Sequence, residues 1–152
     1  MTRWCDKVIR AVEADGPGGY AVAFPAYRPD LVSALAVALG CAHVDFRKEV
    51  LGPHGFAAHT LPLTEIEHCA QSRAAGRGIV LANAEALLAA KPEDERCAFL
   101  AAFLTRPRRH VALLPLALYG ALAAGHPRLV TLDEADLPAE TLLSQLASMR
   151  IG

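Results

Sequence analysis

The clearest structural unit of the chain is Tyr20–Gly40, which reads YAVAFPAYRPDLVSALAVALG. Its first five residues form a short apolar run, which is typical of a strand that is buried on both faces of a sheet. Pro29 and Asp30 then favour the start of a helix, and Gly40 favours its end. The unit therefore predicts a strand followed by a helix that ends at Leu39.

The same alternation recurs along the rest of the chain. Further apolar runs predict four more strands, at Cys41–Phe46, Ile79–Ala82, Val111–Leu114 and Leu129–Leu132. Helical patterns lie between and after these runs, in the segments that begin at Thr64 and Asn83 and in Glu93–Leu104, Leu116–Ala124 and Leu137–Met149. Five strands that alternate with helices predict a mainly parallel sheet with helices on both faces, in one three-layer α/β domain.

Local signals add detail to this pattern. Thr64 and Glu67 have the spacing of a capping box at the start of a helix. Asn83 favours the N-cap of the next helix, which we expect to break near Pro92. The segment Arg47–Pro62 has no clear period, and its length favours either a functional loop or a short strand that the pattern hides.

The chain begins with an amphipathic helical pattern over residues 1–15, with Trp4 and Val8 on its apolar stripe. This helix either packs on the sheet or docks into a partner protein. The run DGPGG at residues 15–19 ends it, and the predicted sheet core extends over residues 20–149. The sequence has no internal repeat and no linker, so residues 1–152 are predicted to form a single domain.

Composition limits the function classes. The 152 residues carry a formal net charge of -1, with 53% hydrophobic and 20% charged residues. These values exclude intrinsic disorder and argue against a dedicated binder of nucleic acid or of membrane surfaces. The longest apolar stretch, Val111–Ala124, is too short to span a bilayer, and the first residues lack the pattern of a signal peptide. The four cysteines form no CxxC pair and are expected to be free thiols, so we predict a cytoplasmic protein.

Candidate binding residues follow the predicted strands, because ligands of open α/β sheets bind beyond the carboxyl ends of the strands. Arg28 follows the first strand, Asp45 lies near the end of the second, and Asn83 and Glu85 follow the third. Arginine suits contacts with anions, and a carboxylate acts as an acid or base or holds a cation. These four residues are therefore predicted to line a site at this edge of the sheet.

The order of elements over Tyr20–Ser148 resembles the core of P-loop NTPases of the RecA or AAA type, and the run Ile79–Ala82 before Asn83 and Glu85 carries the resemblance. The resemblance implies a RecA-like fold. It also implies that the first strand leads into a phosphate loop, that the third carries the Walker B acids and that the fourth is the sensor strand. Glu85 would then take the place of the water-activating acid.

The motifs themselves depart from the family pattern. A phosphate loop uses glycines, a lysine and a serine or threonine to surround phosphates and magnesium. The segment Phe24–Leu31 contains none of these residue types, and Pro25 and Pro29 remove two backbone donors. Asn83 stands where an aspartate would help to hold magnesium. The sequence therefore predicts degenerate Walker motifs, with no catalytic residue and no nucleotide cofactor.

A basic cluster precedes the fourth strand and consists of Arg106, Arg108 and Arg109. It is either a solvated connection or a contact for an anion, such as nucleic acid, a nucleotide on a neighbouring subunit or an acidic protein surface. Replacing its three arginines is expected to abolish partner binding and to leave the fold intact. The six histidines lack the spacing of metal ligands, so no metal site is predicted.

These observations favour a non-catalytic or catalytically degraded P-loop-like binding subunit of a larger protein assembly. A bacterial DNA-processing or defence complex is one such assembly, and a homo-oligomer is another. The expected contact regions are the turn Phe24–Asp30, the segment Arg47–Pro62 and the cluster Arg106–Arg109. The alternative is a small α/β enzyme that acts on a nucleotide or phosphorylated ligand through the charged residues at the carboxyl ends of the strands.

Overall fold

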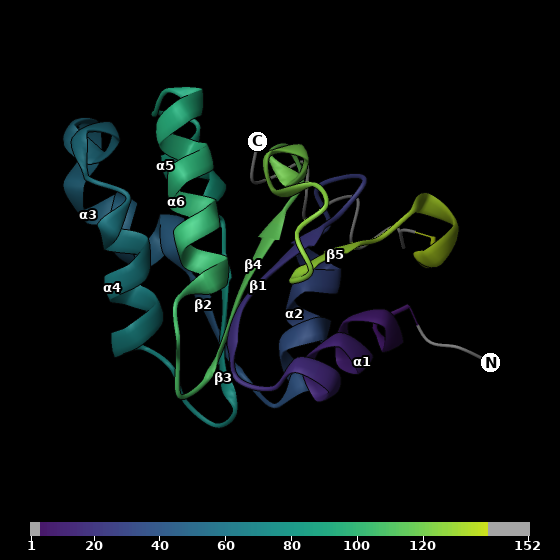
Figure 1. Ribbon diagram of the computed structural model, residues 1–152. Helices are drawn as coiled ribbons and strands as arrows, with labels where there is room; N and C mark the ends of the chain where they lie inside the picture. The colour runs from purple at the N-terminus through teal and green to yellow at the C-terminus, as the bar shows by residue number, and fades with distance from the viewer. Residues whose placement is uncertain (1–3, 140–152) are drawn as a thin grey trace.

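The computed structural model describes residues 4–139, in which a five-stranded parallel sheet lies between two layers of helices (Figure 1). The strands are β1 (Gly18–Ala23), β2 (Ala42–Asp45), β3 (Gly78–Ala82), β4 (Val111–Leu116) and β5 (Leu129–Thr131). Their order across the sheet is β2-β3-β4-β1-β5, and each pair of neighbours is parallel. The predicted α/β fold class is therefore confirmed, with a strand at each of the predicted positions.

One face of the sheet is covered by α1 (Asp6–Asp15) and α2 (Pro29–Leu39). Side chains alternate between the two faces along a strand. Tyr20 and Val22 of β1 lie on the face that these helices cover, where they join Val8 and Leu35 in one buried cluster. Because all four side chains are fully buried, both helices belong to the core. The helix α2 ends at Gly40, whose left-handed φ of 68° is easily adopted by glycine.

The opposite face is covered by α4 (Thr64–Ser72), α5 (Glu85–Leu88), α6 (Glu93–Thr105) and the 3-10 helix η3 (Gly120–Ala123). A second buried cluster fills this side and includes Ile79, Leu81 and Leu114 from the strands. The helix α6 packs closely on β1, because Gly19 has no Cβ atom that would collide with the backbone of Phe103. The sheet therefore separates two cores, as its apolar strands predict.

Two predicted segments differ from the structure. The segment Arg47–Pro62 is neither an open loop nor a strand, but a series of short helical turns, η1 (Arg47–Leu51), α3 (Gly52–His54) and η2 (Gly55–Thr60). The predicted helix Leu116–Ala124 is wrong over its first half, since β4 continues to Leu116 and helical structure is confined to η3. Pro115 is tolerated inside β4 because the pairing with β3 stops at Leu113, beyond which that side of β4 needs no N–H donor.

Two predicted helix caps are wrong as well. The N-cap of α4 is Leu63, without a side-chain cap, because Glu67 is hydrogen-bonded to an arginine rather than to the start of its own helix. The N-cap of α5 is Ala84, and Asn83 precedes it with a left-handed φ of 63°. The break near Pro92 is confirmed, since it separates α5 from α6.

Part of the prediction falls outside the described residues. These parts are residues 1–3 of the predicted N-terminal helix and residues 140–149 of the predicted closing helix. Just before the latter, η4 (Glu134–Asp136) is a 3-10 turn with a capping box formed by Asp133 and Asp136. Within residues 4–139, no helix is long and apolar enough to cross a bilayer.

Candidate functional site

A pocket of about 500 Å³ lies at the carboxyl edge of the sheet. The chain leaves β1 toward α2 on one face and leaves the neighbouring β4 toward η3 on the other face, so the two loops diverge. Ligands of parallel α/β sheets bind where loops diverge in this way. The polar side chains that line the pocket are Tyr27, Arg28, Arg47, Asn83 and Glu85, and the rest of the lining is apolar. Three of the predicted binding residues therefore lie around one pocket.

Asn83 joins the ends of three elements at this edge. Its Nδ2 donates a hydrogen bond to Oδ1 of Asp45 over 2.9 Å, and its Oδ1 accepts one from the hydroxyl of Tyr27 over 3.2 Å. The same Oδ1 of Asp45 accepts a hydrogen bond from the backbone N–H of Lys48 over 3.2 Å. The predicted residues Asp45 and Asn83 are thus in contact, and together they fix the loop after β1 and the first turn after β2.

Glu85 is bound to the loop that follows β4. One carboxylate oxygen accepts a hydrogen bond from the N–H of Ala117 over 2.6 Å, and the other accepts two, from Leu118 over 2.9 Å and Tyr119 over 3.0 Å. Successive backbone N–H groups of this kind form a favourable site for an anion. Both oxygens of Glu85 are therefore occupied by the protein itself, and the side chain positions a wall of the pocket.

Arg28 is also engaged within the chain. Its side chain is only 7% exposed, and the guanidinium forms a two-pronged contact with Asp30 over 3.1 and 3.0 Å. A further nitrogen donates to the carbonyl oxygen of Pro138 over 2.9 Å. The carbonyl of Arg28 accepts hydrogen bonds from the N–H groups of Leu31 and Val32 in the first turn of α2. Arg28 therefore links the start of α2 to the segment after β5.

Three exposed residues complete the rim of the pocket. Arg47 is exposed, and its side chain makes no hydrogen bond or ion pair with another residue of the described chain. Tyr27 is 44% exposed, and Leu118 is 75% exposed. Sequence reasoning placed Tyr27 and Arg47 in contact regions without singling them out, and it missed Leu118 because that residue was assigned to a helix. A sequence signal existed for all three, since each follows the end of a strand.

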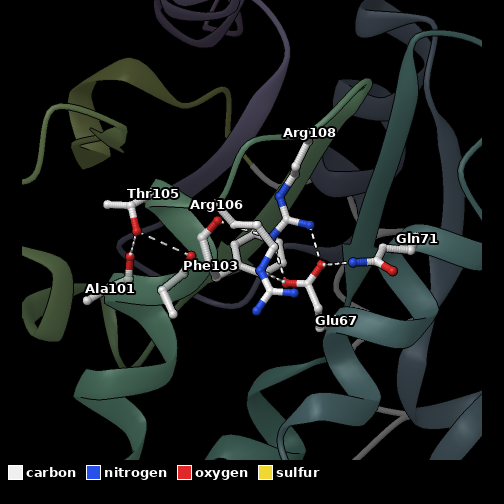
Figure 2. A network of polar contacts seen from close by, with 8 residues as sticks. Glu67, Gln71, Ala101, Phe103, Thr105, Arg106 and Arg108 are labelled. Atoms are coloured by element: carbon white, nitrogen blue, oxygen red, sulfur yellow. Dashed lines mark hydrogen bonds and ion pairs between the residues drawn. The ribbon is translucent and has the colours of Figure 1, made fainter.

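The cluster Arg106–Arg109 lies at the other edge of the sheet, where β4 begins. Figure 2 shows the guanidinium of Arg108 directed at the carboxylate of Glu67 in α4. One of their contacts joins Nη2 to Oε1 over 2.7 Å, and Nη2 also donates to the carbonyl oxygen of Phe103 over 3.1 Å. The guanidinium lies 4.2 Å from the centre of the Phe103 ring. Because the Arg108 side chain is only 7% exposed, it is a structural residue that joins α4 to the end of α6.

Two further contacts surround the Glu67 carboxylate. Nε2 of Gln71 donates to it over 3.0 Å, and Nε of Arg106 lies 3.8 Å from it. Burial alone would raise the pKa of Glu67, but the hydrogen bonds and the charge of Arg108 outweigh burial and lower the pKa. The three arginines therefore do not form one basic patch, and the expectation that all three can be replaced without harm to the fold does not fit the buried Arg108.

The helix α1 packs on its own sheet, which is the first of the two interpretations of its apolar stripe. Val8 is fully buried, and Trp4 is half-buried, with its ring centre 6.2 Å from that of Phe24. Val8 is therefore covered by the same chain, whereas Trp4 keeps part of its surface exposed. A partner-docking face does not fit the burial of Val8, and for Trp4 it stays a prediction.

Histidine, cysteine and acidic side chains elsewhere in the described part of the chain were the remaining candidates for a site. Among residues 4–139, no three side chains of histidine, cysteine, aspartate or glutamate gather where they could hold a metal ion. All four cysteines are free, and burial raises the pKa of the Cys41 and Cys69 thiols. In comparisons with known proteins, no family model, curated protein or solved structure matches the chain.

Proposed function

We propose that the chain is a non-hydrolysing, P-loop-like binding subunit of a larger protein assembly. One observation carries the proposal: the charged residues predicted to bind a ligand at the carboxyl ends of β1 and β3 are used to hold the protein together. Glu85 is bound to three backbone N–H groups, and Arg28 is bound to Asp30 and to the Pro138 carbonyl. A water-activating acid needs a carboxylate oxygen that faces the attacking water.

The topology supports the P-loop-like part of the proposal. The strand β4 lies between β1 and β3, so the strands that the resemblance assigns to the phosphate loop, the sensor and the Walker B acids end side by side around the pocket. The loop after β1 nevertheless provides Pro25 and Pro29 in place of backbone donors. The strand order of a nucleotide-binding sheet is thus combined with a loop after β1 that lacks the groups needed to bind phosphate.

The surface of the pocket supports a protein partner. Its lining is mainly apolar, and Tyr27 and Leu118 present large side chains to solvent on its rim. Protein interfaces gain much of their affinity from a few large side chains of one partner that enter well-packed pockets of the other. The basic cluster contributes less to the proposal, because Arg108 is paired with Glu67 and leaves a weaker positive surface for nucleic acid.

A calorimetric titration with ATP and magnesium tests the proposal. We expect no binding tighter than a Kd of about 100 μM, which corresponds to roughly -5.5 kcal/mol. A phosphate-release assay on the same preparation is expected to give no turnover above buffer. Tighter binding that comes with turnover would overturn the proposal.

The second candidate is a small α/β enzyme for a nucleotide or phosphorylated ligand. The volume of the pocket favours it, since about 500 Å³ lies within the roughly 300–1,000 Å³ that is typical of small-molecule sites. This candidate predicts saturable ligand binding that weakens in Arg28→Ala and in Arg47→Ala. Arg47→Ala is the cleaner of the two variants, because Arg28 also anchors α2 and its replacement is expected to disturb the fold.

A further inference from the structure

We propose that the pocket at the carboxyl edge docks a segment of a partner protein that inserts a large apolar side chain between Tyr27 and Leu118 and places a carboxylate beside Arg47. The inference rests on the proposed function, and it adds the chemistry of the partner. Three properties of the pocket support this inference. Its rim is apolar and extends into solvent, the side chain of Arg47 has no partner in the described chain, and the walls are held by hydrogen bonds within the protein.

The apolar rim favours a protein segment over a small ligand. Phe24 and Leu116 form part of the buried wall, whereas Leu118 is 75% exposed and Tyr27 is 44% exposed. A small molecule inside the pocket would leave much of Leu118 in water. A peptide that crosses the opening would cover both rim residues and bury its own apolar side chain between them, which is the arrangement of an anchor residue in a protein interface.

The charges around the pocket favour an acidic neighbour of that anchor. Glu85 is satisfied by backbone N–H groups, and Arg28 is bound to Asp30. Arg47 is the charged side chain of the lining that has no hydrogen bond or ion pair within residues 4–139. A carboxylate from the partner would form an ion pair with Arg47. Electrostatic complementarity of this kind sets the register and the choice of partner.

The walls of the pocket are held in place before any partner arrives. The carboxylate of Glu85 fixes the backbone of Ala117–Tyr119, which includes Leu118. The side chain of Asn83 accepts a hydrogen bond from the hydroxyl of Tyr27, which also lines the pocket. Binding to fixed walls avoids part of the entropy that ordering a loop would cost. Glu85 and Asn83 are therefore positioning residues for the rim.

The probe for this proposal is a library of random linear peptides displayed on phage. It is selected on the wild-type chain and counter-selected on Leu118→Asp. We expect the enriched peptides to share a leucine, phenylalanine or tryptophan next to an aspartate or glutamate, and to bind Leu118→Asp at least about tenfold more weakly in fluorescence anisotropy. The matched control is Val37→Asp on α2, at a side chain that is 80% exposed and lies outside the pocket. This control is expected to bind the peptides like the wild type.

A charge exchange then tests the contact with Arg47. Arg47→Glu is expected to weaken an enriched peptide by about threefold to tenfold, and a peptide with lysine in place of its acidic residue is expected to recover the loss on this variant. Lys48→Glu is the control, since Lys48 follows Arg47 in sequence and does not line the pocket. Melting curves of all variants are measured alongside, and the exposed substitutions are expected to leave the melting temperature unchanged.

Two outcomes would overturn the inference. One is a selection that enriches no peptide, or peptides that bind Leu118→Asp as well as the wild type. The other is an enriched motif without an acidic residue, or one that is insensitive to Arg47→Glu. Both leave the proposed function standing, because that proposal fails on ATP binding with turnover, which the separate titration measures.

Discussion

The two edges of the sheet use their polar side chains in different ways. At the amino edge, Glu67 and Arg108 are both nearly buried and neutralise each other between α4 and the end of α6 (Figure 2). At the carboxyl edge, Glu85 and Asn83 hold loops around an open pocket, and Arg47 stays exposed on its rim. At the amino edge, the charged pair fills the space between two helices. At the carboxyl edge, the polar side chains hold loops apart around a pocket.

The comparison shows that a dense group of charged residues in the sequence is not the same as a charged surface in the folded protein. Three arginines within four positions look like a binding patch, but the middle one, Arg108, is occupied by an acid 41 positions away. Arg47 has no arginine neighbour in sequence, and yet it lines the pocket. The proposed recognition therefore relies on a single exposed arginine beside an apolar pocket rather than on the denser cluster.

The largest effect on the comparison is expected from Arg108→Ala. It removes one partner of a nearly buried ion pair and leaves the Glu67 carboxylate with weaker contacts, so the free energy of unfolding should fall by about 3 kcal/mol. Urea denaturation measures the loss. Arg109→Ala, at an exposed position of the same cluster, should change the stability by less than about 0.5 kcal/mol. Equal losses of stability in the two variants would contradict the view that Arg108 is structural and Arg109 is not.

A smaller loss is expected from Glu85→Ala at the carboxyl edge. Three backbone N–H groups lose their acceptor, of which that of Leu118 is exposed and can turn to water. The free energy of unfolding should therefore fall by about 2 kcal/mol. Hydrogen exchange at Ala117–Tyr119 should accelerate more than at β4, which separates a local loosening of the wall from global unfolding. Glu13→Ala, at an exposed position of α1, is the control and should leave both readouts unchanged.

The smallest effect is expected from acid titration of Glu67, since burial and Arg108 act on it in opposite directions. Its pKa is lowered from the ordinary value of 4.5, so its charge stabilises the fold above that pH and loses this effect as the pH falls through the folded pKa. The stability difference between the wild type and Glu67→Gln should be constant near neutral pH and narrow below about pH 4.5. If the stability difference between the wild type and Glu67→Gln stayed constant down to low pH, the charge of Glu67 would not contribute to stability.

Sequence patterns predicted the strands and most helices, because these depend on neighbours along the chain. The apolar run before Pro25 and the helix end at Gly40 are local signals, and both elements occur where the signals lie. The pattern misled at Leu116–Ala124, where an apolar run continues β4 before it turns. It misled again at Asn83, whose side chain bonds to Asp45 and Tyr27 rather than to a helix start.

The candidate site was predicted only in part. The rule that ligands bind at the carboxyl ends of strands found Arg28, Asn83 and Glu85, which line the pocket. The same rule could not say that Arg28 and Glu85 are occupied by other parts of the chain. Asp30 is a near neighbour of Arg28 in sequence, but the Pro138 carbonyl lies 110 positions away, and the hydrogen bonds of Glu85 reach residues more than 30 positions away.

The sequence alone determined that this protein is an α/β chain with strands buried on both faces, and that its first strand leads into a segment without glycine, lysine, serine or threonine. Only the tertiary structure decided the strand order, the pairing of Arg108 with Glu67, and the exposure of Arg47 and Leu118 around one pocket. The physical reason is the separation along the chain over which each kind of interaction acts. Periodicity, proline and glycine act over a few residues, whereas ion pairs and pockets depend on which distant segments the two cores bring together.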